Sequence, residues 1–146
     1  MSDAIVLLEG TVERSSDGGT TWTDIPEAKG IAIPTVEKEY KDVTSLASGG
    51  FREYKPGLKD AGVITVPCNY TPDGYEAMLA DEATGDVIMY RATLDPAPSQ
   101  SAGDVFTFAG FPTPKVDNPS VGDEVMMNLE IRTSGTVTWT KGAAAV

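Results

Sequence analysis

The side chains of this sequence that could do chemistry are 22 carboxylates and one thiol, because the chain contains no histidine. Ser-His-Asp and Cys-His catalysis need an imidazole and an HExxH zinc site needs two, so these arrangements are excluded. Pairs of Asp and Glu can cleave glycosides, but among 22 acidic residues some pair always falls at a plausible spacing. We therefore predict a protein that is not an enzyme and holds neither a cofactor nor a metal ion.

Cys68 is the only cysteine, which excludes an intramolecular disulfide and a cysteine-rich zinc site. It follows Val66 and Pro67 in an extended segment, where a buried thiol is the expected state. Residues 48–50, Ser-Gly-Gly, precede no predicted helix and lack the lysine that a phosphate-binding loop needs. Neither feature predicts a reactive site.

The charge balance limits the partners of the chain. Eleven Lys and Arg against 22 Asp and Glu give a net charge of −11, whereas a protein that wraps nucleic acid needs a surplus of cations. The balance is compatible with a surface that DNA passes without binding.

No apolar run approaches the ~20 residues of a membrane span, and the N-terminus lacks the basic and apolar regions of a signal peptide. We expect no membrane insertion, and action in the cytoplasm or within an assembled particle.

Residues 15–22, Ser-Ser-Asp-Gly-Gly-Thr-Thr-Trp, match the pattern S-x-D-x-G-x-T-W. Asp17 can accept hydrogen bonds from backbone amides of a turn, Gly19 can take a positive φ, and Trp22 can fold back over a hairpin. The pattern resembles the Asp-box of sialidases and related propellers, which repeat it and in which it carries no catalytic group. Because it occurs once here, it predicts a stable hairpin turn.

Strand patterns dominate the rest of the chain. They cover residues 4–14, 20–25, 30–40, 62–70, 86–94, 104–111, 121–132 and 136–140. Pro34 lies inside the third segment, which predicts an edge strand or a bulge there. The seventh segment alternates, as a strand with one face in the core does. Its core-facing residues are Val125, Met127, Leu129 and Ile131.

One helix is predicted, starting after Thr71. Thr71 can cap its first turn, Pro72 suits the first helical position, and Gly85 can end it. The residues that share its apolar face are Tyr75, Met78 and Leu79.

Before the helix, residues 41–61 form a polar, glycine-rich stretch without a period, which predicts a long loop that has a function or is disordered. The pattern as a whole predicts a single domain, residues 1–146, folded as an antiparallel β-sandwich or barrel of seven to eight strands with one flanking helix.

Several short motifs follow one another in a fixed order. Thr44 opens the long loop, residues 54–62 read Tyr-Lys-Pro-Gly-Leu-Lys-Asp-Ala-Gly, and the helix begins with Pro-Asp-Gly at 72–74. Later come Phe-Thr-Phe-Ala-Gly-Phe at 106–111 and Ile-Arg-Thr-Ser-Gly-Thr-Val-Thr at 131–138. Together these motifs, over most of residues 30–140, resemble the major tail proteins (tail tube proteins) of siphophages.

The resemblance implies a structural subunit of the tail tube of a long, non-contractile-tailed bacteriophage or phage-like particle. Members of the family form hexameric rings whose inner sheets join into one barrel, and the rings stack into a hollow conduit for the genome. The implied partners are further copies of the chain, the tape-measure protein, the tail terminator and the distal tail or baseplate proteins. DNA would pass through the lumen without specific binding, and the protein would be found in the virion after synthesis in the bacterial cytoplasm.

The resemblance also implies roles for two sets of residues. The 41–61 loop would be mobile in the monomer and would connect rings through Lys41, Asp42, Thr44, Arg52, Glu53, Tyr54, Lys55, Lys59 and Asp60. A solvated loop explains those charges equally well. An acidic lumen would repel the DNA backbone, and the candidates to line it are Glu37, Glu39, Asp104, Asp117, Asp123, Glu124 and Glu130.

Two alternative functions remain open at this point. One is the tube subunit of a contractile tail or a secretion-type injection machine, which shares the sandwich and ring plan. The other is a monomeric carbohydrate-binding module, which Trp22, Trp139 and the 15–22 turn favour.

Overall fold

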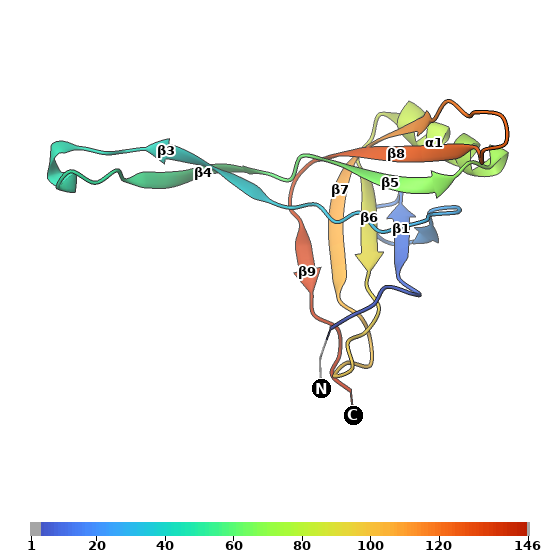
Figure 1. The fold of residues 1–146 in the computed structure, drawn as a ribbon, viewed down its shortest axis with the longest axis horizontal. Helices are drawn as coiled ribbons and strands as arrows, with labels where there is room; N and C mark the ends of the chain where they lie inside the picture. The colour runs from blue at the N-terminus through green and yellow to red at the C-terminus, as the bar shows by residue number, and fades with distance from the viewer. Residues whose placement is uncertain (1–3, 146) are drawn as a thin grey trace.

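The structure is a computed structural model and describes residues 4–145. It consists of a β-sheet body with one α-helix and a long two-stranded arm that projects from one side of the body (Figure 1). The elements in chain order are β1 (Thr11–Ser15), β2 (Thr23–Asp24), β3 (Glu37–Asp42), the single 3-10 turn η1 (Leu46–Ser48), β4 (Tyr54–Asp60), β5 (Val63–Asn69), α1 (Pro72–Thr84), β6 (Ile88–Thr93), β7 (Val105–Val116), β8 (Met126–Thr133) and β9 (Thr138–Thr140).

Seven strands form the antiparallel sheet of the body, in the order β2-β1-β6-β7-β8-β5, with β9 pairing β7. The long strand β7 joins two layers, since residues 105–110 pair with β6 and residues 110–116 pair with β8. In Figure 1, β1, β6, β7 and β9 run vertically, whereas β5 and β8 cross them horizontally. The predicted antiparallel sandwich is confirmed, with crossed layers that share a strand.

Gly110 marks the point at which β7 changes its partner strand. A Cβ atom there would lie 2.5 Å from the carbonyl oxygen of Arg132 and 2.6 Å from the side chain of Ile131. Only glycine permits this approach of β8. Beyond Gly110, Pro112 and Pro114 lie in the part of β7 that pairs with β8. The other edge of this part of β7 has no partner strand within residues 4–145, so the N–H groups that proline lacks are not needed there.

The core lies between the two layers and beneath α1. Alternate residues of the strands fill it, and the largest buried side chains are Tyr90, Phe108, Met78, Ile88, Met127, Leu129, Ile131, Val66 and Cys68. The predicted alternation of β8 is confirmed from Met127 to Ile131 but is wrong at Val125, which precedes the strand and is exposed. Burial raises the pKa of the Cys68 thiol to about 11, so this buried thiol is unreactive, as predicted.

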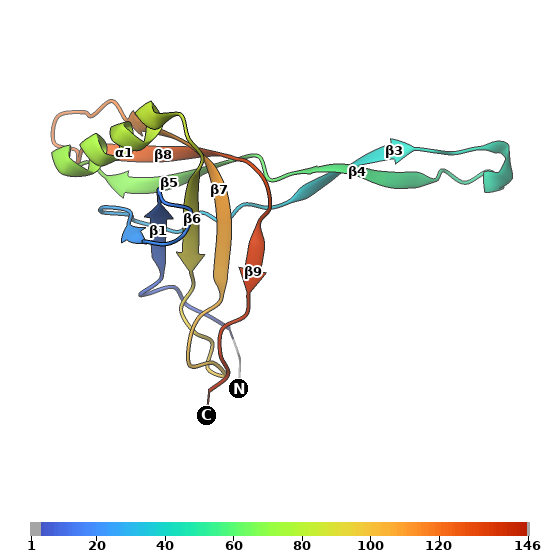
Figure 2. The same ribbon diagram turned by 180° about the vertical axis from the view of Figure 1, so that it is seen from behind.

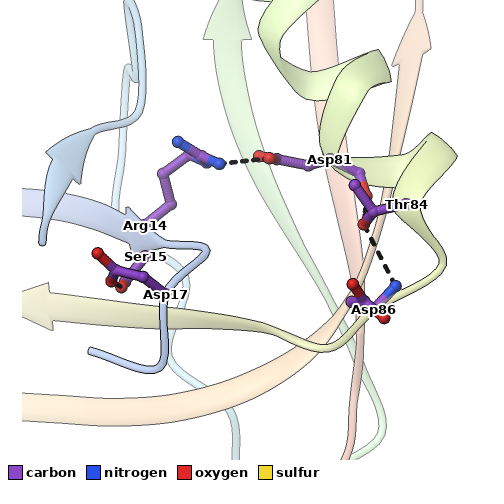
Figure 3. Close-up of polar contacts among 6 residues, drawn as sticks. All are labelled: Arg14, Ser15, Asp17, Asp81, Thr84 and Asp86. Carbon is purple, nitrogen blue, oxygen red and sulfur yellow. Dashed lines mark hydrogen bonds and ion pairs between the residues drawn. The ribbon is translucent and has the colours of Figure 1, made fainter. Parts of the chain in front are cut away.

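The helix α1 begins and ends where the sequence predicts. The Thr71 hydroxyl accepts a hydrogen bond from the Gly74 N–H at 3.1 Å, and Gly85 ends the helix with φ of 69°. The predicted apolar face is correct for Met78 but wrong for Leu79, which is exposed. Asp81 is buried instead, because the helix turns this position toward the cation of Arg14 on β1 (Figure 3).

Three predicted strands begin at least five residues later in the structure. Segment 4–14 is a strand only from Thr11, where pairing with β6 begins, and segment 121–132 only from Met126. Segment 30–40 is a strand only from Glu37, so the prediction of Pro34 inside an edge strand is wrong. Pro34 is buried and precedes the strand, so its lack of an N–H group removes no hydrogen bond between strands.

The expectation of a loop over residues 41–61 holds for the secondary structure of residues 43–53 and is wrong for the residues on either side of them. Residues 41–42 and 54–60 belong to β3 and β4, which pair in antiparallel fashion from Glu37↔Asp60 to Asp42↔Tyr54. Irregular backbone is confined to the tip between the two strands, apart from η1. The alternation is hidden because neither face of this hairpin is buried, so neither face is apolar. No helix within residues 4–145 is long and apolar enough to cross a bilayer.

Candidate functional site: the projecting arm

The arm, residues 37–60, extends away from the body and contributes nothing to the core (Figures 1 and 2). Every residue of β3 and β4 is exposed. A two-stranded hairpin without a hydrophobic face to bury is marginally stable on its own in water. A stretch of this length therefore indicates a surface that another molecule covers.

Large apolar side chains line the arm. The exposed ones are Tyr40, Val43, Leu46, Phe51, Tyr54 and Leu58. Leu46 and Phe51 at the tip are 105% and 78% exposed, and Leu58 on β4 is 79% exposed. Single exposed apolar residues are common, but a series along one projecting element marks an interaction site. The sequence analysis missed Leu46, Phe51 and Leu58; apolar residues in an otherwise polar segment were the signal that could have found them.

The tip of the arm is shaped by local hydrogen bonds. The Thr44 hydroxyl accepts from the Glu53 N–H at 2.8 Å, and the Val43 N–H donates to the Glu53 carbonyl at 2.9 Å. The Asp42 carboxylate accepts from the Thr44 N–H at 2.9 Å and lies 3.6 Å from the Arg52 guanidinium. Hydrogen bonds from the side chain and then the backbone of Thr44 lower the pKa of Asp42. These contacts give the tip a defined shape.

The root of the arm is attached to the body through Asp60. Its carboxylate accepts from the Gly62 N–H at 3.0 Å and from Arg132 of β8 at 3.1 Å. The Gly62 N–H, and after it the Arg132 guanidinium, lower the pKa of Asp60. A cavity of about 490 Å³ adjoins this attachment and is lined by residues of the arm root and β5, among them Ile33 and Ile64.

The nine residues predicted to contact a neighbouring ring all lie on the arm. Lys41, Asp42, Tyr54, Lys55, Lys59 and Asp60 are on its strands, and Thr44, Arg52 and Glu53 are at its tip. The structure thus brings this set onto one element, and their contact with another ring stays a prediction.

The seven acidic residues predicted to line a lumen do not form one group. Asp117, Asp123 and Glu124 lie together in the loop between β7 and β8 and line a hollow of about 400 Å³. The remaining four are separate from that loop. Glu37 and Glu39 are on the arm, Asp104 binds the Gly142 N–H at 2.8 Å, and Glu130 pairs with Lys115 at 2.6 Å.

The 15–22 segment is the predicted hairpin turn. The Asp17 carboxylate accepts from the Ser15 hydroxyl at 2.6 Å and from the N–H groups of Thr20 and Thr21 at 3.1 and 2.9 Å. These bonds, with that from Ser15 the largest contribution, hold the pKa of Asp17 at about 2, below its ordinary 3.8. The Trp22 ring lies under the guanidinium of Arg91, at 4.3 Å. The turn is therefore a local staple with its aromatic ring already engaged.

The part of the chain that the structure describes contains no group of three or more His, Cys, Asp or Glu side chains that could hold a metal ion. The ion pair of Arg14 with Asp81 is largely buried and joins β1 to α1 (Figure 3). Burial, and after it the charge of Asp81, raise the pKa of the neighbouring Tyr90. These groups hold the helix on the sheet.

No protein-family model matches the chain, and no curated protein matches it by sequence. Solved structures do share its fold. A chain in the tail of an empty gene transfer agent particle, refined with C6 symmetry, is 20% identical with a TM-score of 0.67, over 89% of this chain and 94% of that one. A chain of the SPP1 tail tube is 11% identical with a TM-score of 0.66, over 96% of this chain and 81% of that one.

The same fold occurs in a contractile machine. A chain of the sheath-tube complex of the PVC extracellular contractile injection system, in its extended state, is 14% identical with a TM-score of 0.67. The match covers 94% of this chain and 92% of that one. At these identities the similarity shows a shared fold, which confirms the predicted fold class.

Proposed function

We propose that this chain is a structural, non-enzymatic subunit of the tail tube of a long, non-contractile-tailed bacteriophage or phage-like particle. Its copies would form hexameric rings, and the rings would stack into a hollow conduit for genome passage. The observation that carries the proposal is the arm, which exposes every residue of its two strands on a fold shared with tube subunits. An element of this kind gains its stabilisation from a neighbouring subunit.

The open edge of β5 supports ring closure. Lys29 N–H donates to the Pro67 carbonyl at 2.8 Å and Asn69 N–H donates to the Glu27 carbonyl at 2.9 Å, so a preceding segment covers the end of this edge. Within residues 4–145, no strand pairs with the outer edge of β5 near Val63 and Thr65. A strand of a neighbouring copy would pair there and remove the exposed edge.

The charge of the chain suits a conduit. A net charge of −11 gives a surface that repels the DNA backbone, so a genome could slide past without binding. We propose the tail terminator, the tape-measure protein and distal tail or baseplate proteins as further partners. The chain would be part of the virion, after synthesis in the bacterial cytoplasm.

A second candidate is the tube of a contractile tail or injection machine. The similarity to the PVC sheath-tube complex, with a TM-score of 0.67, equals that to the gene transfer agent tail. Tubes that form from the purified chain favour the non-contractile assignment, whereas stacking that needs a sheath protein favours the contractile one. The carbohydrate-binding alternative has lost its support at Trp22, whose ring is covered by Arg91.

The test is negative-stain electron microscopy with light scattering at rising concentrations of the purified chain. Rings or hollow tubes are expected. Replacement of residues 43–53 by an Asn-Gly turn should abolish stacking and leave the thermal unfolding of the body unchanged. A chain that remains monomeric up to its solubility limit, at low and high salt, would argue against a self-assembling tube.

A further inference from the structure

The arm carries a charge pattern that opposes its own folding. In the register of β3 and β4, Glu37 lies opposite Asp60, Lys38 opposite Lys59, and Lys41 opposite Lys55. All three pairs join like charges, and like charges directly opposite one another destabilise an antiparallel pair. Arg132 compensates the charge of Asp60, so the two lysine pairs are the points at which the ladder of the hairpin is weakened.

The two lysine pairs lie on opposite faces of the arm. Lys38 and Lys41 are three residues apart on β3, and alternation places such positions on opposite faces. The register shift between Lys38 and Tyr40 puts its extra residue on β4, so the pairing resumes with Lys41 opposite Lys55. A Cβ on Gly57 would lie 4.0 Å from Lys41 Cε, on the Lys41 face. Each face of the arm thus presents a pair of ammonium groups.

Five of the six basic residues of the body are engaged in ion pairs, whereas the lysines of the arm strands are not. Arg14, Lys29, Arg91, Lys115 and Arg132 each pair with a carboxylate. In the described part of the chain, none of the four arm lysines forms an ion pair. The arm holds five basic and five acidic residues, so the remainder of the chain carries the whole net charge of −11.

Resting on the proposed tube function, we propose that the four arm lysines bind carboxylates on the body of a second copy of this chain. The geometry points to the loop between β7 and β8 as the acceptor, where Asp117, Asp123 and Glu124 line one hollow. Asn128 donates to the Asp117 carboxylate and Lys29 lies 3.6 Å from Glu124, so Asp123 is the carboxylate of the three that has no side-chain partner within residues 4–145. Figures 1 and 2 show this loop and the arm at opposite ends of the molecule. Contacts between opposite ends are head-to-tail and repeat from copy to copy, which builds a stack.

Docking relieves the repulsion within the arm. Each lysine pair gains carboxylate partners, which it does not have within the arm, and the apolar side chains beside the lysines become covered. Association and ordering of the arm are therefore coupled, and the association weakens with salt because the contacts are between exposed charges.

The decisive variant is K41E, which turns the Lys41–Lys55 pair into an opposite-charge pair. Two readouts move in opposite directions. In the monomer at low concentration, amide hydrogen exchange of β3 and β4 slows, because the ladder loses a repulsion. The concentration at which copies associate rises by about tenfold, because a docking contact is lost.

Charge exchange identifies the acceptor. D123K alone weakens association, and K41E mixed with D123K restores it to within about threefold of the wild type, because each then offers the other an opposite charge. K141E, which changes a lysine near the C-terminus and away from the arm, is the matched control and leaves association unchanged.

The outcomes separate the two proposals. If the wild-type chain forms tubes and K41E forms them equally well, the proposed lysine contact is wrong and the proposed tube function stands. Faster exchange of the arm in K41E overturns the cross-strand repulsion. If K41E weakens association and mixing it with D123K does not restore association, the β7–β8 loop is not the acceptor. A wild-type chain that never associates overturns the tube function and the docking together.

Discussion

The strands β6 and β3 both have six residues and both lie in antiparallel pairs, yet their surroundings differ completely. In β6, Ile88, Tyr90 and Ala92 alternate with half-buried residues and are at most 2% exposed. In β3, every residue is exposed, and its two lysines face lysines across the ladder. The body contains the apolar contacts that stabilise it, whereas the arm contains almost none.

The residues of a chain can stabilise its own fold or its contacts with other molecules, and the body and the arm differ in this respect. The residues of the body are selected by contacts within the chain, so their removal should lower the free energy of unfolding. The residues of the arm are selected by contacts outside the chain, so their removal should leave that free energy unchanged and alter association instead. Matched substitutions in the two regions test this division.

The largest effect is expected for Phe108→Ala in the body. Phe108 is 2% exposed and stacks on Tyr90 with ring centroids 5.8 Å apart. Removal of a buried aromatic ring lowers the free energy of unfolding by about 4 kcal/mol. The matched change in the arm, Phe51→Ala, should alter it by less than about 0.5 kcal/mol. Urea denaturation of both variants measures the difference, and equal losses would contradict the division.

Asp81→Ala should have the next largest effect. The carboxylate pairs with Arg14, whose Nε is buried without a hydrogen-bond partner, so its loss leaves a cation without a counter-charge. We expect a loss of about 3 kcal/mol. The double variant R14M/D81L should recover most of it, because both charges are then removed. Thermal and urea unfolding check this, and a double variant as unstable as D81A would exclude the explanation.

A threonine in each region accepts a backbone hydrogen bond, and the two should differ in their effect. Thr71→Ala removes the cap at the start of α1 and should cost about 1 kcal/mol of the stability of the body. Thr44→Ala removes the bond to the Glu53 N–H at the tip of the arm and should leave global unfolding unchanged. Hydrogen exchange should detect the T44A change only in the arm.

The smallest effect is expected from the titration of Asp17. Its folded pKa of about 2 lies below the ordinary 3.8, so its contribution to stability is present above pH 3.8 and is lost as the pH falls toward 2. The melting temperature of D17N should therefore lie below that of the wild type at pH 5, and the gap should close near pH 2. Asp42 also has a lowered pKa, but its titration should affect only the arm. A constant gap for D17N would refute this account.

Local signals predicted well those features that depend on neighbours in sequence. The cap at Thr71, the end of α1 at Gly85 and the turn around Asp17 need only residues within a few positions, and all three are confirmed. The alternation from Met127 to Ile131 predicted burial because one face of β8 meets the core. Leu79 was wrongly placed because helical periodicity cannot tell that Asp81 has a partner on β1.

The strand β4 and the end of β3 were mistaken for a loop for the same physical reason. These strands show no apolar alternation, since no face of them is buried, and apolar alternation is the signal from which half-buried strands are recognised. The residues named as contacts fall on one element because they were all taken from the contiguous segment 41–61, and their contact with another ring stays a prediction. The lumen candidates came from charge alone, and the structure distributes them over several regions.

The sequence by itself determined the absence of imidazole chemistry, the excess of negative charge, the helix and the turn, because composition and short-range bonding do not depend on the path of the chain. Tertiary structure alone decided that β7 joins the layers at Gly110 and that Lys41 faces Lys55. It also decided that the arm and the acidic β7–β8 loop lie at opposite ends of the molecule (Figure 2). These features depend on which distant segments pair and in what register, and pairing between distant strands is set by the whole core rather than by any local stretch.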